Sequence, residues 1–349
     1  MRVLLTGSAG FIGTAVGSTL EASGHDVVRI DLLLPQAHGR DAAAPPGTQV
    51  LDVRDAGEWR GVLDGVDVVC HQAAVVGAGV AVSDLPAYAS HNDLGTAALL
   101  AAMHQADVDR LVLASSMVVY GEGRYACAEH GVRVPGPRRV EALEAGDVEN
   151  HCPDCDRALG WETVDEDDRL DPRSSYAASK LAQEHYASSW VRQADASAVA
   201  LRYHNVYGPG MPRDTPYSGV AAMFRSSLER GESPQVYEDG GQVRDFVHVD
   251  DVARANLAAV EAVGTGALPP YRAYNVASGT PVTILDVARL VASGVPGTTP
   301  EPEVTGGYRL GDVRHVVASP ARATAELGFT AEVRPETGLP AFATAPLRG

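Results

Sequence analysis

A tyrosine and a lysine four residues apart, Tyr176 and Lys180, form the first pattern that could do chemistry in this chain. On a helix, residues at this spacing lie on one face, one turn from each other. A nearby ammonium favours the phenolate, so the pair would let Tyr176 act as a base below the ordinary phenol pKa of about 10. Such pairs also occur by chance on surface helices. A catalytic interpretation of the pair therefore requires that the rest of the chain also supplies a redox-cofactor site and a proton relay.

Three cysteines and a histidine form a second pattern. Cys127-Ala-Glu-His130 and Cys152-Pro-Asp-Cys155 make a Cys₃His set, which suits tetrahedral zinc. The segment around them has few large apolar residues, and a metal would supply folding free energy that it lacks. Four protein ligands predict a structural zinc site rather than a catalytic one. The alternatives are three thiols that lie near one another by chance, or His151 in place of one ligand.

The elements that would position Tyr176 begin with a glycine-rich turn. Residues 3–6 are an apolar strand, followed by Gly7-Ser-Ala-Gly10-Phe-Ile-Gly13 and a helical run over 14–23. Glycines at this spacing let the backbone turn tightly, approach a pyrophosphate and pack the helix on the strand. The turn predicts a dinucleotide site, with a simple tight connection as the alternative.

An acidic residue follows the next strand. Residues 26–30 read as a strand that ends at Asp31, eighteen residues past Gly13, where a carboxylate accepts hydrogen bonds from a ribose diol. Because a carboxylate repels a 2′-phosphate, Asp31 favours NAD over NADP. The alternative is an aspartate that caps a structural turn.

Further strands alternate with helices, at 48–51, 66–70 and 110–114, with a helix over 94–106 between the last two. This rhythm predicts an α/β fold, a Rossmann-type doubly wound parallel sheet whose ligands lie at the carboxyl ends of its strands. The residues at those ends are Asp52, Val53, Gln72, Ala73, Ala74, Ser115 and Ser116.

The composition of the chain argues against some classes of binding partner. The chain has 45 acidic and 28 basic residues and a formal net charge of −17, which argues against nucleic acid and against an anionic membrane surface. It has no signal-peptide layout and no apolar run near the length of a membrane span, which predicts a cytoplasmic protein. Four cysteines in 349 residues do not make a disulfide scaffold, and Cys70 is expected in the core.

A series of motifs runs in one order over nearly the whole chain. They include the glycine turn from Thr6 to Gly13, Asp31, His71-Gln-Ala-Ala74, Asn92-x-x-Gly-Thr, Ser115-Ser-Met-Val-Val-Tyr-Gly121, Tyr176-x-x-x-Lys180, Leu201-Arg-Tyr-His-Asn205, Val243-Arg-Asp-Phe-Val-His-Val-Asp250 and Arg309-Leu-Gly-Asp312. Together they resemble the extended short-chain dehydrogenase/reductase family, in its NAD-dependent nucleotide-sugar epimerase/dehydratase branch, which includes UDP-glucose 4-epimerase-like proteins.

The resemblance implies roles for particular residues. Tyr176 is the base, Lys180 lowers its pKa and holds the nicotinamide ribose, and Ser116 is the relay hydroxyl. The implied NAD-binding residues are Gly7, Gly10, Phe11, Ile12, Gly13, Asp31, Asp52, Val53, Gln72, Ala73, Ala74, Asn92, Ser115, Tyr176, Lys180 and Tyr203. The implied contacts to a nucleoside-diphosphate sugar are Ser116, Met117, Asn205, Arg244 and Arg309.

Some of these residues have structural alternatives. Ser115 and Ser116 can cap a turn at the end of a strand. Arg244 or Arg309 can belong to a surface salt bridge. For His204, a packed and hydrogen-bonded side chain is the expected role.

The residues after Ser116 distinguish reactions within the family. The dehydratase branch carries Asp-Glu directly after the relay hydroxyl, whereas this chain has Met117 and Val118, which have no ionisable group. We therefore predict a 4-epimerase, which oxidises C4 to a ketone and returns hydride to the opposite face. The alternatives are a dehydratase or net oxidoreductase of the same family, and a non-catalytic NAD-binding regulator.

The expected domains are an NAD-binding domain over 1–205, with an insertion at 122–173, and a substrate-binding domain over 206–349. Within the latter, 243–277 is expected to return to the Rossmann sheet. The resemblance also implies a homodimer formed through two long helices, one of which carries Tyr176.

Overall fold

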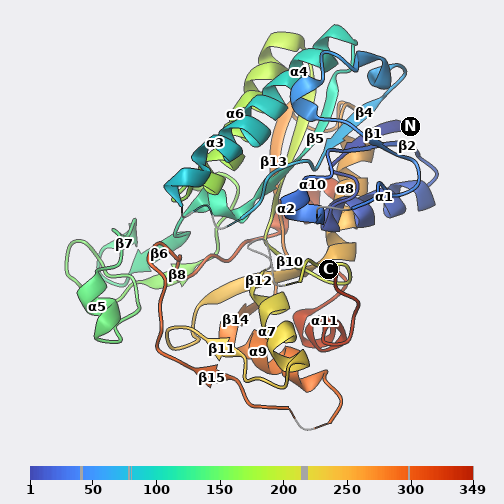
Figure 1. Ribbon diagram of the computed structural model, residues 1–349. Helices are drawn as coiled ribbons and strands as arrows, with labels where there is room; N and C mark the ends of the chain where they lie inside the picture. The colour runs from blue at the N-terminus through green and yellow to red at the C-terminus, as the bar shows by residue number, and fades with distance from the viewer. Residues whose placement is uncertain (40–41, 78, 80, 214–218, 298, 349) are drawn as a thin grey trace.

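A seven-stranded parallel sheet forms the centre of the larger of two lobes (Figure 1). The computed structural model describes residues 1–349 except 40–41, 78, 80, 214–218, 298 and 349. In spatial order the strands are β13 (Tyr271–Val276), β9 (Ser197–Tyr203), β5 (Arg110–Ser116), β4 (Val68–His71), β1 (Arg2–Thr6), β2 (Asp26–Asp31) and β3 (Thr48–Val50). This order confirms the doubly wound parallel fold. The chain leaves β1 toward β3 and returns at β4, so a crevice opens at the carboxyl ends of β1 and β4.

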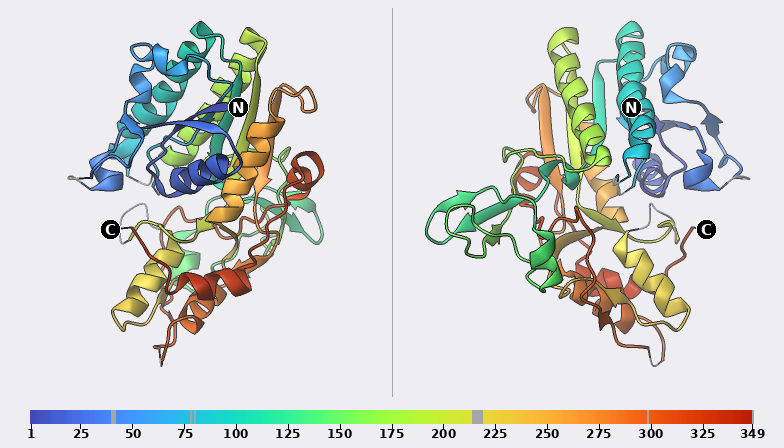
Figure 2. Two further views of the ribbon diagram at one scale, coloured as in Figure 1. Left: turned by 90° about the vertical axis from the view of Figure 1, so that its right-hand side faces the viewer. Right: turned by 60° about the vertical axis from the view of Figure 1, so that its left-hand side comes forward.

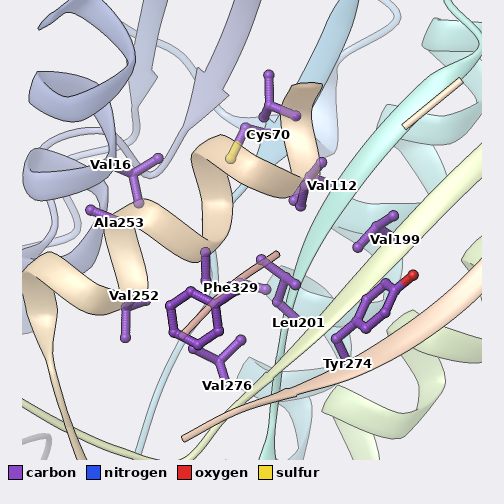
Figure 3. Close-up of a cluster of buried hydrophobic side chains, with 14 of the residues drawn as sticks. Val16, Cys70, Val112, Val199, Leu201, Val252, Ala253, Tyr274, Val276 and Phe329 are labelled. Atoms are coloured by element: carbon purple, nitrogen blue, oxygen red, sulfur yellow. The ribbon is translucent and has the colours of Figure 1, made fainter. Parts of the chain in front are cut away.

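Helices cover both faces of the sheet, which explains why its strands are apolar on both sides. Val3 and Leu5 of β1 belong to one core and Leu4 to the other, because side chains alternate along a strand. The first core lies under α1 (Phe11–Ala22), α8 (Val249–Ala262) and α10 (Ala321–Leu327), and the second under α4 (Gly95–Gln105) and α6 (Ser175–Ala194). Figure 3 shows the first core, in which the expected core residue Cys70 packs near α8.

The smaller lobe is built on two short sheets. One contains β10 (Asn205–Tyr207), β12 (Val243–His248) and β14 (Pro281–Thr283), and the other contains β11 (Gln235–Val236) and β15 (Glu303–Val304). Its helices are α7 (Val220–Glu229), α9 (Ile284–Ser293) and α11 (Pro335–Phe342).

The expected return of 243–277 to the Rossmann sheet is wrong for its first part. The strand β12 pairs with β10 and β14 in the smaller lobe, while α8 and β13 alone rejoin the large lobe. A short apolar run predicts a strand without naming its partner, and this partner is set by the register with β10.

The segment 122–173 stands out beside both lobes (Figures 1 and 2). It contains β6 (Arg124–Cys127), β7 (Gly131–Arg133), α5 (Val140–Glu144) and β8 (Gly160–Glu162), with β6 in the middle of a three-stranded sheet. Ion pairs attach it to the smaller lobe. Arg138 of the segment binds Glu238 at 2.8 Å, and Glu149 of the segment binds Arg314 at 2.6 Å.

Short helical segments complete the described chain. They are α2 (Pro35–His38), α3 (Leu85–Tyr88), a π-helical turn (Ala89–Leu94) and 3₁₀ turns at Val53–Asp55, Arg60–Leu63, Val82–Asp84 and Met117–Tyr120. Within the described ranges, no helix is both long enough and apolar enough to span a bilayer.

Candidate active site

The carboxyl ends of the sheet strands open into one cavity of about 480 Å³. We call its part around Gly7–Gly13, Asp31 and Gln72–Ala74 the glycine end, and its part around Ser116, Met117, Tyr176 and Asn205 the tyrosine end. The residues expected at the site that line this cavity are Gly7, Gly10, Phe11, Ile12, Gly13, Asp31, Asp52, Val53, Gln72, Ala73, Ala74, Ser115, Ser116, Met117, Tyr176, Lys180, Tyr203 and Asn205.

Close backbone packing explains the glycines at the glycine end. Gly7 has φ +67°, and a Cβ there would lie 2.6 Å from the backbone nitrogen of Ala73. A Cβ on Gly13 would lie 2.0 Å from the carbonyl oxygen of Gly7. Helix α1 begins here without a side-chain cap. Its first amides are therefore available to an anion such as a pyrophosphate.

Asp31 at the end of β2 is held in place by backbone amides. Its Oδ2 accepts from Ala9 N at 2.9 Å, its Oδ1 accepts from Leu33 N at 2.8 Å, and His38 Nε2 lies 3.4 Å from Oδ1. Burial opposes ionisation, but these hydrogen bonds outweigh it and hold the pKa of Asp31 below its usual value. The carboxylate is thus charged at neutral pH, which suits a ribose diol and disfavours a 2′-phosphate. Its surroundings fit NAD.

Tyr203, which lines the cavity, is fixed by two side-chain amides. Its hydroxyl donates to Gln72 Oε1 at 3.1 Å and accepts from Asn256 Nδ2 at 2.8 Å. Asn92, expected at the cofactor, does not line the cavity. Its side chain is buried, accepts from Val75 N at 2.7 Å and donates to Ser179 Oγ at 2.8 Å. Asn92 therefore ties the segment after β4 to α6.

Helix α6 brings the tyrosine and the lysine together, as their spacing predicted. Ser174 begins the helix, its Oγ accepting from Ala177 N at 3.1 Å. Lys180 Nζ lies 5.9 Å from the ring centroid of Tyr176 and donates to the carbonyl of Ala114 at 3.0 Å.

Burial dominates the protonation of this pair. It raises the pKa of Tyr176 above its ordinary value, against a hydrogen bond with Ser116 that lowers it. Burial also lowers the pKa of Lys180 to about 7, against the nearby charge of Glu184. The direction for Tyr176 is opposite to the one expected from its spacing with Lys180, because the side chain is buried and desolvation disfavours the phenolate. The hydrogen bond places Ser116 where a relay hydroxyl is needed.

Known proteins are similar to this chain over nearly its whole length. A profile described as the NAD dependent epimerase/dehydratase family matches residues 3–139 and 153–277. The chain belongs to this family. A dTDP-L-rhamnose 4-epimerase from Burkholderia thailandensis is 35% identical over 356 residues, covering 97% of this chain and 93% of its own length.

Solved structures of family members have the same fold. The UDP-glucose 4-epimerase of Thermotoga maritima with UDP-glucose has a TM-score of 0.78 at 27% identity, covering 98% of this chain and 97% of its own. The UDP-glucose 4-epimerase of Thermus thermophilus, in complex with NAD, has a TM-score of 0.74 at 30% identity, covering 98% of both chains. The named relatives and neighbours of this family member are thus mainly NAD-dependent nucleotide-sugar 4-epimerases, as the sequence predicted, and a dTDP-glucose 4,6-dehydratase is also among the structural neighbours.

Two predicted diphosphate ligands of this epimerase-family chain, Arg244 and Arg309, are not among the residues that line the cavity. Arg244 donates to the carbonyls of Val313 and Arg314, at 2.5 Å and 2.8 Å. Arg309 is exposed and stacks its guanidinium 4.9 Å from the ring centroid of Tyr237.

The four expected metal ligands do come together. Cys127 Sγ lies 3.7 Å from Cys155 Sγ and 3.5 Å from His130 Nδ1, and Cys152 Sγ lies 3.6 Å from the same nitrogen. All four ligand atoms lie within 4.8 Å of one another. Zinc bonds of ordinary length in a tetrahedron require sulfur–sulfur distances of about 3.8 Å and sulfur–nitrogen distances of about 3.6 Å. The donor set and its spacing fit zinc.

His151 does not join these four ligands. It bonds the carbonyl of Asp156 at 2.7 Å and pairs with Asp147 at 3.0 Å.

Some cavity residues were not expected from their local pattern. His204 was expected as a packed and hydrogen-bonded side chain. It is buried and lines the cavity, but neither of its ring nitrogens has a hydrogen-bond partner among the described residues, and burial lowers its pKa to about 3. Val75 and Val76 directly follow the small pair Ala73-Ala74, and this adjacency could have indicated that they line the cavity. Others come from separate segments, namely His38, Met211, Phe246 and Arg348, and of these Phe246 lies within the motif from Val243 to Asp250.

Proposed function

We propose that this protein is an NAD-dependent 4-epimerase of a nucleoside-diphosphate sugar. One observation carries the choice among the family's reactions. Among the described residues that line the cavity, the carboxylates are Asp31 and Asp52, and both lie at the glycine end. Next to Ser116 the wall is formed by Met117, in a turn that continues with Val118. Elimination of water would need an ionisable group beside the sugar, and these side chains supply none.

Bound NAD would lie along the cavity from Asp31 to Lys180 and would supply a hydride acceptor at its nicotinamide. The chain's own residues move the proton. Tyr176 takes it from the sugar C4 hydroxyl, Ser116 bridges the two oxygens, and Lys180 supports the phenolate together with the positive nicotinamide.

Apolar side chains at the tyrosine end serve the second half of the reaction. Val75, Val76, Ala87 and Met117 line the cavity there and offer no hydrogen bond to a ring hydroxyl. These side chains would therefore leave a 4-keto sugar free to turn and present its other face. Hydride then returns to C4, and Tyr176 returns the proton to the oxygen.

The fate of a deuterium at C4 of the sugar tests this proposal. An epimerase returns the label to C4 of the other epimer without added reductant and without net NADH. Transfer of the label to C6 with loss of water would establish a dehydratase instead. Stoichiometric NADH would establish an oxidase, and a complete lack of turnover across a panel of nucleotide sugars would favour a regulator.

We also propose a structural zinc ion held by Cys127, His130, Cys152 and Cys155. Purified protein should contain about one zinc per chain by plasma mass spectrometry. The variant Cys152→Ser should lose the metal, while Cys70→Ala, which changes a core cysteine, should keep it. A metal content near zero in the unmodified protein would remove this proposal.

We further propose a homodimer formed through α4 and α6. A surface groove between the two helices is lined by small and aromatic residues, and Tyr186 in it is 43% exposed. The groove residues include Ala97, Leu100, Ala101, Tyr186, Trp190 and Ala194. Light scattering should report twice the chain mass, and Ala101→Arg should shift it to one chain. A single-chain mass for the unmodified protein would contradict the dimer.

A further inference from the structure

An arginine near the end of the described chain joins the two lobes across the glycine end of the cavity. Its own segment is fixed to the smaller lobe. Gly210 N donates to the carbonyl of Pro346 at 2.8 Å, Arg348 N donates to that of Met211 at 3.1 Å, and Arg213 N donates to that of Arg348 at 2.9 Å. Leu347 packs against the core of the same lobe. The backbone of Arg348 is therefore anchored.

The side chain of Arg348 reaches the other lobe. Its Nη1 donates to the carbonyl of Ala9 at 2.5 Å, inside the glycine turn, and its Nη2 donates to that of Ala37 at 3.0 Å, in α2. Ala9 also donates its amide to Asp31, so the guanidinium sits beside the ribose-binding carboxylate. Figures 1 and 2 show this end of the chain between the two lobes, near α2.

The charge of this side chain suits a dinucleotide. Arg348 is the sole arginine among the described residues lining the cavity, and Lys180 lies at the other end. Burial lowers the pKa of Arg348, although the charge of Asp31 opposes this, so its cation is partly desolvated. A pyrophosphate carries two negative charges, and a guanidinium offers it parallel donors. The α1 amides alone supply only partial charges.

We propose that Arg348 binds the pyrophosphate of NAD and, through its anchored segment, keeps the cofactor in place between turnovers. In the bound state one of its two carbonyl contacts is exchanged for a phosphate oxygen. An epimerase regenerates its NAD in each cycle, so retention of the cofactor serves the reaction. The inference rests on the proposed function only in requiring that NAD is the cofactor.

The test compares Arg348→Ala and Arg348→Lys with Arg213→Ala, a control in the adjoining loop that pairs with Glu229 at 3.0 Å. NAD release is followed by gel filtration and by displacement with excess labelled NAD. We expect Arg348→Ala to release NAD at least about tenfold faster than the unmodified protein. Arg348→Lys should release NAD at an intermediate rate, because lysine keeps the positive charge but lacks the two parallel donors of a guanidinium. Arg213→Ala should release NAD at the unmodified rate. An unchanged release rate in Arg348→Ala would overturn the proposal.

A second measurement separates a phosphate contact from loss of local structure. Thermal shifts with ADP and with adenosine are compared, and melting without ligand reports folding. Loss of the preference for ADP in Arg348→Ala supports the pyrophosphate contact, whereas equal weakening for both ligands overturns it. If the unmodified protein bound no NAD, the proposed function itself would fail. Normal NAD binding with an unaffected variant would remove this inference alone.

Discussion

The glycine end of the cavity is formed mainly by backbone atoms, whereas the tyrosine end is formed mainly by side chains. At the glycine end, backbone atoms of successive strand ends form the surface, and Gly7, Gly13 and Ala73 approach so closely that a Cβ does not fit on either glycine. At the tyrosine end, side chains from β5, α6 and β10 meet, and the two predicted diphosphate arginines are not among the residues that line the cavity. The geometry of a site made of backbone atoms is determined once the sheet forms. A side-chain site depends on how separate segments and lobes are brought together.

Removing the hydroxyl at the tyrosine end should have the largest effect on turnover. We expect Tyr176→Phe to lower kcat by roughly 10²–10⁴-fold, the usual contribution of a positioned acid–base group. NAD content, which depends on the glycine end, should stay normal. Steady-state rates and the NAD absorbance of the same preparation measure both. Near-normal turnover would remove Tyr176 as the base.

A single methyl group should disrupt the glycine end. In Gly13→Ala the added Cβ would lie 2.0 Å from the carbonyl oxygen of Gly7, so the turn must shift. We expect the purified variant to lose most of its NAD and to recover part of its activity at high NAD concentration. As a control, Gly136→Ala tests a glycine that does not have a positive φ and whose Cβ would meet no atom within 4 Å. Full NAD content in Gly13→Ala would contradict the backbone-built site.

Two arginine variants test how far the tyrosine end extends. If Arg244 and Arg309 bind the diphosphate, Arg244→Ala and Arg309→Ala should each raise KM for the nucleotide sugar by about tenfold. This is the change expected when the binding free energy of one charged hydrogen bond is lost. Arg244→Ala should also lower the free energy of unfolding by about 1–3 kcal/mol, because the carbonyls of Val313 and Arg314 lose their donor. Exposed Arg309 should show no such loss. An unchanged KM would leave that arginine with a structural role only.

The pH dependence of stability tests the burial of Lys180 beside the tyrosine end. Burial depresses the pKa of Lys180 to about 7, while an unfolded lysine titrates near 10.4. Between these values the unfolded chain binds more protons than the folded chain, so the stability contribution of Lys180 rises with pH. Relative to Lys180→Met, the unmodified protein should gain at most about 1.4 kcal/mol per pH unit in this window. Urea unfolding at pH 6.5, 8 and 9.5 checks the sign, and a flat difference would contradict it.

Expectations from sequence succeeded where one local segment carries the whole constraint. The glycine turn, the strand ending at Asp31 and the Tyr176–Lys180 helix all formed as predicted. The Cys₃His pattern was also local in its two halves, and the pairing of β6 with its neighbours brought those halves together. Zinc itself stays a prediction.

Expectations weakened where a residue's partner lies far away in the chain. Asn92 matched a cofactor motif, yet it bonds Ser179 in a helix 87 residues later. Strand β12 read as part of the large sheet, yet its register partner is β10. Arg348 has no pattern around it, and its partner carbonyl at Ala9 is 339 residues away.

Local sequence patterns were sufficient for the fold class, the family and the residue types of the reaction, because glycine spacing and helix periodicity act over a few neighbours. Which side chains share the cavity, and what their protonation is, depended on the tertiary structure. The raised pKa of Tyr176 and the lowered pKa of Lys180 come from burial between separate segments, and no spacing along the chain encodes that desolvation. The contact of Arg348 with the glycine turn likewise exists only because the two lobes meet there.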